Sequence, residues 1–257
     1  MATDEQSYFL IVSGNRTGST WLELSLNVLH DVSAAFEMQW TETAPTPFHV
    51  AMRSPGFDIL RTLDDLREGH RVAGSKLVLP GQVDLDDIEN IPNLVPEEVR
   101  IVHLSRRYMD SYLSRIRNAG HLRNPAGKGS RHPWLADVVV EETFCETDAI
   151  DLDLDDARNN FQRRLAFDEQ FSRFDDAQHR YFYVDYETLA ACFRDIARHV
   201  GSGVQDTEIQ SVIDAPPTRK LPPIQYANLV RNFDELVSLG TEFESKRQAL
   251  LSSHGSV

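Results

Sequence analysis

The stretch that decides the fold of this chain is Tyr8-Phe-Leu-Ile-Val-Ser-Gly14-Asn-Arg16-Thr-Gly18-Ser19-Thr20-Trp21-Leu22. A run of strand-forming apolar residues ends at Gly14, a short loop follows, and an amphipathic helix begins near Ser19. Such a loop is a common phosphate site in α/β proteins, because the first turn of the helix offers unpaired N–H groups and the positive end of its dipole. The side chains of Arg16, Ser19 and Thr20 add further donors. The stretch therefore predicts an anion site at the carboxyl end of the first strand.

The loop differs from a Walker A motif, which requires G-x-x-x-x-G-K-[ST] with its lysine on the terminal phosphates. Here only three residues separate Gly14 from Gly18, Ser19 stands in the place of the lysine, and the cation Arg16 precedes the second glycine. An ATP-dependent kinase of the P-loop type is therefore kept only as an alternative. An ordinary strand-to-helix turn capped by Ser19 or Thr20 is another.

A second anion-binding segment follows residues 99–104, which have the pattern of a buried strand. Arg106 stands at the end of this strand, where its guanidinium can bind a phosphate through two N–H groups. Ser114 lies about two helical turns further on, on the same helix face, and can donate another bond. Asp110 is better placed to cap the helix or to orient the arginine. A solvated helix start rich in Arg, Asp and Ser is the alternative.

The loop resembles the 5′-phosphosulfate loop of sulfotransferases that use 3′-phosphoadenylyl sulfate (PAPS), whose pattern is roughly [KR]-[ST]-G-[ST]-T-[WFL]-L. The spacing of Arg106, Asp110 and Ser114 is similar to that of the 3′-phosphate element in the same family. The stretch Tyr181-Phe-Tyr-Val-Asp-Tyr186-Glu187-Thr-Leu189 resembles the strand and Y-E-x-L element late in this fold. The matches follow the family order over nearly the whole chain, and they are nearer to bacterial members with a catalytic glutamate than to the animal cytosolic type.

Both the alternation of strands and helices and the resemblance imply an α/β fold. The expected architecture is a single three-layer domain over residues 1–257, with a mostly parallel central sheet flanked by helices, of the P-loop-like sulfotransferase type. Residues 118–150 are expected to form a lid or insertion, and residues 252–257 a frayed tail. The expected strands cover 8–13, 32–36, 71–79, 99–104 and 181–185; the expected helices cover 19–31, 57–68, 84–90, 155–174, 188–200 and 232–251; and 43–55 is expected to be loop.

The resemblance implies that the chain moves a sulfuryl group from PAPS to a hydroxyl or amine of a small-molecule or glycan acceptor. It implies no metal, because side-chain cations and backbone amides stabilise the leaving phosphate. A catalytically silent nucleotide-binding relative is a further alternative. The sequence does not indicate which acceptor is used.

Two groups of site residues follow from the resemblance. The catalytic residues are Glu37 as base, with His49 and His132 as rival bases, Arg16 at the leaving phosphate, and Lys76 as a helper. The donor-binding residues are Asn15, Arg16, Thr17, Gly18, Ser19, Thr20, Trp21, Arg106, Ser114, Arg219 and Lys220. For Glu37 an exposed loop carboxylate remains the alternative. For Trp21 stacking on adenine and packing in the core remain open, and for Arg219 and Lys220 a solvent-facing loop remains the alternative.

Composition excludes several other classes of protein. The chain has 257 residues, of which 41% are hydrophobic and 26% charged, as in a soluble globular protein. The formal net charge of −14 argues against nucleic acid and anionic membranes as partners. No secretory or membrane-spanning segment is evident, and the two cysteines, Cys145 and Cys192, indicate no disulfide framework. A cytoplasmic location is expected, and the sequence carries no signal for the oligomeric state.

Overall fold

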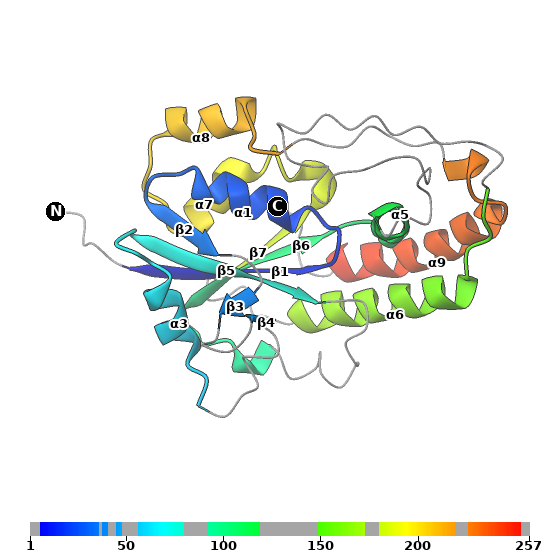
Figure 1. Cartoon of the computed structure of the whole chain (residues 1–257), viewed down its shortest axis with the longest axis horizontal. Coiled ribbons are helices and arrows are strands. Elements are labelled where there is room, and N and C mark those ends of the chain that lie inside the picture. The colour runs from blue at the N-terminus through cyan, green and yellow to red at the C-terminus, as the bar shows by residue number, and fades with distance from the viewer. Residues whose placement is uncertain are drawn as a thin grey trace. The chain divides into compact units, whose positions relative to one another are not determined.

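The structure is a computed structural model of the chain (Figure 1). It describes residues 6–35, 38–40, 45–47, 56–79, 92–118, 149–172, 180–218 and 226–252. By its internal contacts the chain divides into two compact units. The first unit comprises Met1–Arg106 and Ala166–Pro216, and the second comprises Arg107–Leu165 and Pro217–Val257. The expectation of one domain stays a prediction.

The first unit is built on a five-stranded parallel sheet with strand order β2-β5-β1-β6-β7. The strands are β1 (Ser7–Gly14), β2 (Val32–Ala35), β5 (Val72–Leu79), β6 (Val99–Ser105) and β7 (Tyr181–Asp185). From the central strand β1 the chain moves to the β2 edge, returns to β5, and then continues on the other side with β6. Ligands of open α/β sheets bind at the carboxyl ends of the strands where the order reverses in this way. The predicted α/β class with a parallel sheet is confirmed.

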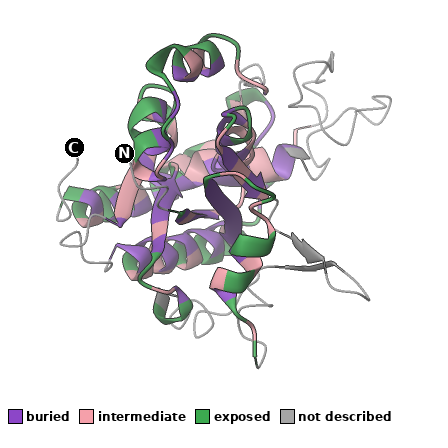
Figure 2. Cartoon of the chain, turned by 90° about the vertical axis from the view of Figure 1, so that its left-hand side faces the viewer, coloured by how far each residue is buried: buried purple, intermediate pink, exposed green. Residues whose placement is uncertain are grey.

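The sequence of β1 explains its central place. Phe9, Leu10, Ile11 and Val12 are all completely buried. A continuous apolar run is typical of a parallel strand covered on both faces, whereas a strand with one wet face alternates. Figure 2 shows the strands of the sheet largely buried, with exposed residues on the outer turns of the helices.

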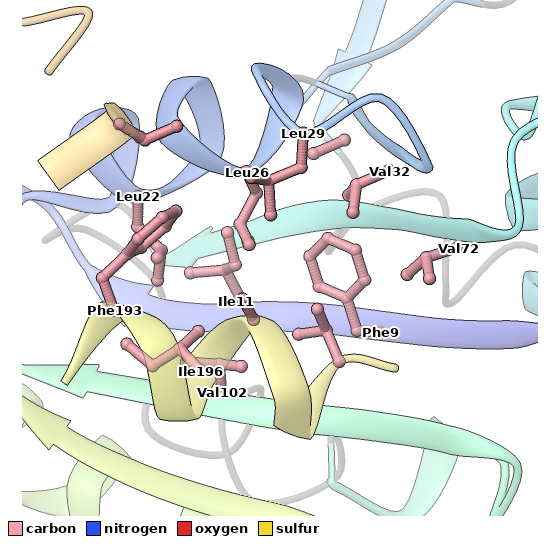
Figure 3. Close-up of a cluster of buried hydrophobic side chains, with 14 of the residues drawn as sticks. Phe9, Ile11, Leu22, Leu26, Leu29, Val32, Val72, Val102, Phe193 and Ile196 are labelled. Atoms are coloured by element: carbon pink, nitrogen blue, oxygen red, sulfur yellow. The ribbon is translucent and has the colours of Figure 1, made fainter. Parts of the chain in front are cut away.

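Helices cover the two faces of this sheet and give the three layers that the sequence predicts. On one face lie α1 (Ser19–Asn27), α7 (Phe193–His199) and α8 (Asp206–Asp214), with Phe9 and Ile11 in the same cluster. Figure 3 shows side chains of α1 and α7 meeting over Ile11. On the other face, α3 (Ile59–Asp65) and the last turns of α6 (Leu154–Phe171) pack with Leu10 and Val12.

The second unit has a helical core of its own. Its elements are α5 (Tyr108–Asn118), the first part of α6, the short helix η5 (Tyr226–Asn228) and α9 (Phe233–Ser252). Tyr112 and Phe243 both pack edge-on against the buried Phe161 ring of α6, with centroids 5.8 and 5.6 Å away. Because α6 is one continuous helix, it runs through the division between the units at Leu165 and Ala166.

Several predicted boundaries are corrected by the structure. The helix predicted to reach residue 31 ends at Asn27. The side-chain amide of Asn27 donates to the Ala34 carbonyl and accepts from the Ala34 N–H, so the end of the helix is bonded to strand β2. Part of the predicted loop 43–55 is a strand: β4 (Pro45–Pro47) pairs antiparallel with β3 (Met38–Trp40). The predicted helix 84–90 lies outside the described residues.

Two further differences concern helices. The predicted helix 188–200 is divided into the 3₁₀ turn η4 (Tyr186–Thr188) and α7, since Asp185 accepts from the Glu187 N–H at 3.2 Å and closes a tight turn. Helix α8 and the 3₁₀ turn η1 (Pro92–Leu94) were not predicted. None of the described helices has both the length and the apolar character needed to cross a bilayer.

Candidate anion-binding site

The loop after β1 has the backbone of an anion cradle. Arg16 and Gly18 have positive φ angles of 66° and 93°, while Thr17 between them does not. Alternation of this kind turns successive N–H groups toward one side and forms a concavity that binds anions. The Thr17 hydroxyl donates to the Gly14 carbonyl at 2.9 Å and ties the loop to the strand end.

Helix α1 begins at the edge of this loop without a capping side chain. Its N-cap is Gly18, in the left-handed region, and no side chain bonds the N–H groups of the first turn from that position. The alternative of an ordinary turn capped by Ser19 or Thr20 is therefore wrong. The first turn also holds no acidic residue, so its N–H groups and the helix dipole favour an anion.

Tyr186, in η4, explains why Gly18 cannot carry a side chain. A Cβ built on Gly18 would lie 2.6 Å from both Cδ2 and Cε2 of the Tyr186 ring. The glycine is thus required twice, once for its φ angle and once for the close approach of the ring. The Y-E-x-L element identified in the sequence braces the loop through this contact.

Arg106, directly after β6, joins the loop and Tyr186. Its Nη1 donates to the Arg16 carbonyl at 3.1 Å, and its Cζ lies 4.2 Å from the centroid of the Tyr186 ring. Within the described part of the chain, its Nε is buried and has no hydrogen-bond partner. Three segments that are far apart in the sequence therefore meet at the carboxyl ends of β1, β6 and β7, with guanidinium donors beside the cradle.

Lys76, predicted as a catalytic helper, is held by an ion pair that the sequence analysis missed. Its Nζ lies 2.6 Å from Oε2 of Glu23 on α1 and donates to the Thr20 hydroxyl at 3.2 Å. The side chains of Lys76 and Glu23 are 3% and 0% exposed. The available signal was the spacing of Glu23 four residues after Ser19 and three before Leu26, which places a carboxylate on the buried face of α1.

The remaining loop residues differ in how far they are buried. Ser19 is buried, and Asn15 and Thr20 are half-buried. Trp21 packs edge-on against Phe193, with ring centroids 5.6 Å apart, so core packing is observed for this residue.

The described structure does not test the other predicted site residues. Ser114 is half-buried on α5 and belongs to the second unit, so its role beside Arg106 stays a prediction. Asp110, also in the second unit, pairs with Arg107 at 2.7 Å. The residues that lie outside the described part are Glu37, His49, His132, Arg219 and Lys220.

A buried hydrogen-bond network holds the end of β6, directly before Arg106 in the sequence. The fully buried His103 contacts Tyr181 through Nδ1 at 2.6 Å and Asp168 through Nε2 at 2.9 Å. Ser105 donates to the other oxygen of Asp168 at 2.7 Å. Burial raises the pKa of Tyr181 well above its ordinary value, which keeps the phenol protonated. All the bonds are then satisfied if Tyr181 donates to Nδ1 and Nε2–H donates to Asp168.

Comparison with solved structures finds the same architecture in a sulfotransferase from Alicyclobacillus acidocaldarius. The TM-score is 0.51 and the sequence identity 15%, over 98% of this chain and 97% of that one. The chain has the sulfotransferase fold. Mouse sulfotransferase SULT7A1 complexed with PAP gives a lower TM-score of 0.46, with 13% sequence identity over 98% of this chain and 90% of that one. The sulfotransferase domain of the Synechococcus PCC 7002 olefin synthase also gives a TM-score of 0.46, with 12% identity over 100% of this chain and 98% of that one.

Comparison by sequence finds no such relatives. No protein-family model matches the chain, and a search of curated proteins gives no significant match. The sulfotransferase fold is therefore supported by the comparison of structures.

Proposed function

We propose that this chain is a PAPS-dependent sulfotransferase that acts on a hydroxyl or amine of a small-molecule or glycan acceptor. The observation that supports this proposal most directly is the contact between the two anion-binding elements, in which Arg106 donates to the Arg16 carbonyl. A nucleotide with phosphate groups at both its 5′ and 3′ positions needs two such elements side by side. The sulfotransferase fold supports the same reading.

The residues of the cluster fit such a donor. The backbone of Arg16 to Gly18 and the first turn of α1 offer N–H groups to the 5′-phosphosulfate, and the bare Gly18 leaves no side chain in the way. The Arg106 guanidinium stacks on Tyr186 and keeps donors for the 3′-phosphate. We expect Ser114, Arg219 and Lys220 to complete the 3′-phosphate site.

In the proposed reaction, the acceptor oxygen or nitrogen attacks the sulfur of PAPS while the bond from sulfur to the bridging phosphate oxygen breaks. The products are the sulfated acceptor and adenosine 3′,5′-bisphosphate, and the acceptor proton passes to a base. We assign Arg16 to the negative charge that develops on the leaving phosphate oxygen. We assign Glu37 as the base, because the bacterial sulfotransferases that the sequence resembles place their catalytic glutamate at this point of the chain.

The compartment follows from the same proposal. A chain with two cysteines that uses PAPS suits the reducing cytoplasm, where this donor is made.

The first experiment is calorimetric titration of the protein with adenosine 3′,5′-bisphosphate without metal, beside a titration with ATP and Mg²⁺. We expect micromolar or tighter binding of the bisphosphate and much weaker binding of ATP. No binding of the bisphosphate, with ATP bound only in the presence of Mg²⁺, would contradict the proposal and favour a kinase. Tight bisphosphate binding without transfer from PAPS to any member of an acceptor library would favour a silent relative.

A further inference from the structure

The ion pair between Glu23 and Lys76 lies under the first turn of α1, on the side of the sheet that this helix covers. Lys76 is paired in register with Ile11 of the central strand, and Val72 on its own strand faces the same core cluster as Leu22 of α1. Since Glu23 is completely buried, its carboxylate does not reach an acceptor in solution and is poorly placed to act as the base.

Burying these two charges is a poor way to gain stability. Both groups lose their hydration, and a well-packed apolar pair of similar volume is often as stable or more so. The pair therefore suggests a second role, and the second contact of Lys76 indicates which one. Its ammonium also donates a hydrogen bond to the Thr20 hydroxyl, at 3.2 Å.

This contact limits the directions open to the Thr20 hydroxyl proton. An ammonium is a donor only, so the Thr20 oxygen must accept from Lys76 and its own O–H must point elsewhere. Thr20 lies in the first turn of α1, next to the cradle of Arg16 to Gly18. In a Walker A motif the residue at this place bonds Mg²⁺ through its hydroxyl. Here a lysine ammonium contacts that hydroxyl and brings a fixed positive charge to it.

We propose that Glu23 is a positioning residue of the donor site, which holds the Lys76 ammonium against Thr20 so that the Thr20 hydroxyl donates to the 5′-phosphate group. This inference rests on the proposed function, because it takes the anion in the cradle to be the 5′-phosphate end of the nucleotide. Glu23 acts through Lys76 and Thr20 and touches no reacting atom.

The test measures binding of three probes by calorimetry: adenosine 3′,5′-bisphosphate, adenosine 5′-monophosphate and adenosine 3′-monophosphate. The variants are Glu23→Gln and the uncharged double variant Glu23→Gln/Lys76→Met, which removes the risk of leaving one buried charge unpaired. We expect both variants to lose about tenfold in affinity for the two probes with a 5′-phosphate, as for the loss of one charge-assisted hydrogen bond. Binding of the 3′-monophosphate should stay at the wild-type value.

The outcomes separate this inference from the proposed function. If the wild-type protein does not bind the bisphosphate, the proposed function fails, and this inference fails with it. If the wild-type protein binds the bisphosphate and the double variant binds each of the three probes with wild-type affinity, the pair is structural only and the inference is wrong. Equal loss of all three probes, including the 3′-monophosphate, would overturn it too, since the effect would not be confined to the 5′ end. As a cross-check, Glu23→Gln should have no further effect on binding in a Thr20→Val protein.

Discussion

At the scale of single residues, two backbone positions shape the loop after β1. Gly18 takes up a positive φ freely, but Arg16 at φ 66° does so at a cost of about 1–2 kcal/mol for an L-residue. Strain of this kind is retained where the surroundings fix the backbone and function needs it. Here the Arg16 carbonyl is fixed by a hydrogen bond from Arg106 at 3.1 Å.

Gly18→Ala tests the contact with Tyr186. We expect it to lower the free energy of unfolding by about 2–4 kcal/mol, because a Cβ adds a clash with the ring to the φ strain. The matched control is Gly69→Ala, since Gly69 has φ 90° and nothing within 4 Å of its Cβ position. That variant should cost only about 1 kcal/mol. Equal losses in urea denaturation would show that Tyr186 does not press on Gly18.

Arg106→Lys tests the guanidinium. A lysine keeps the charge but loses the planar fork, the stacking on Tyr186 and the geometry of the bond to the Arg16 carbonyl. We expect the dissociation constant for adenosine 3′,5′-bisphosphate to rise about tenfold or more, as for loss of a bidentate phosphate contact. Arg107→Lys is the control, because the neighbouring side chain is 57% exposed and pairs only with Asp110 among the described residues. Unchanged affinity in Arg106→Lys would remove Arg106 from the donor site.

At the scale of elements, the buried network of His103, Ser105 and Asp168 fixes the end of β6 to the last turns of α6. Asp168→Ala should lower the free energy of unfolding by about 3 kcal/mol or more, because it removes the buried carboxylate that His103 and Ser105 both contact. Glu169→Ala, at the exposed next residue, should change it by less than about 0.5 kcal/mol. Amide hydrogen exchange in β6 should accelerate in the first variant and not in the second. Similar stabilities of the two variants would show that the network does not hold the strand.

The elements also show what sequence patterns can predict. The strands at 8–13, 71–79 and 99–104 were predicted to within a residue or two, because each is rich in Val, Ile or Leu over a length typical of a strand. Helix α8 was missed, since it has only nine residues and buries only two apolar side chains, Ile209 and Val212. The predicted end of α1 was wrong because Asn27 bonds a backbone seven residues away, which no local propensity encodes.

The same distinction holds for the site. Arg16 and Arg106 were predicted from the spacing of local motifs, and the structure places them in contact, while their part in donor binding stays a prediction. The Glu23–Lys76 pair could not be predicted, since it depends on which strand lies under α1, and the sheet order decides that. The roles of Glu37, Ser114, Arg219 and Lys220 stay predictions.

At the scale of the whole molecule, each unit contains a tyrosine whose pKa is raised by burial: Tyr181 in the first and Tyr112 in the second. For Tyr112 the negative charge of Asp156 adds to the effect. In the unfolded chain both ionise near their ordinary pKa of 10, while in the folded chain they hold their protons to higher pH. The free energy of unfolding should therefore fall as the pH rises above 10.

Tyr181→Phe and Tyr112→Phe test this dependence one unit at a time. Each variant should show a smaller fall in the free energy of unfolding between pH 9 and pH 11 than the wild-type protein, whatever its stability at pH 8. The value at pH 8 measures the lost packing and hydrogen bonds separately. A variant that keeps the full wild-type fall would show that its tyrosine ionises equally well in the folded chain.

The central place of β1 has a consequence for the order in which the chain is made. Among the described strands β1 comes first in the sequence, and both of its neighbours, β5 and β6, begin much later, at Val72 and Val99. During synthesis β1 must wait for both of the strands that pair with it, and pairing over such long separations is slow. A nascent chain that stops before Ser105 lacks one neighbour of the central strand, so the loop that β1 carries gains its contact with Arg106 only after β6 has been translated.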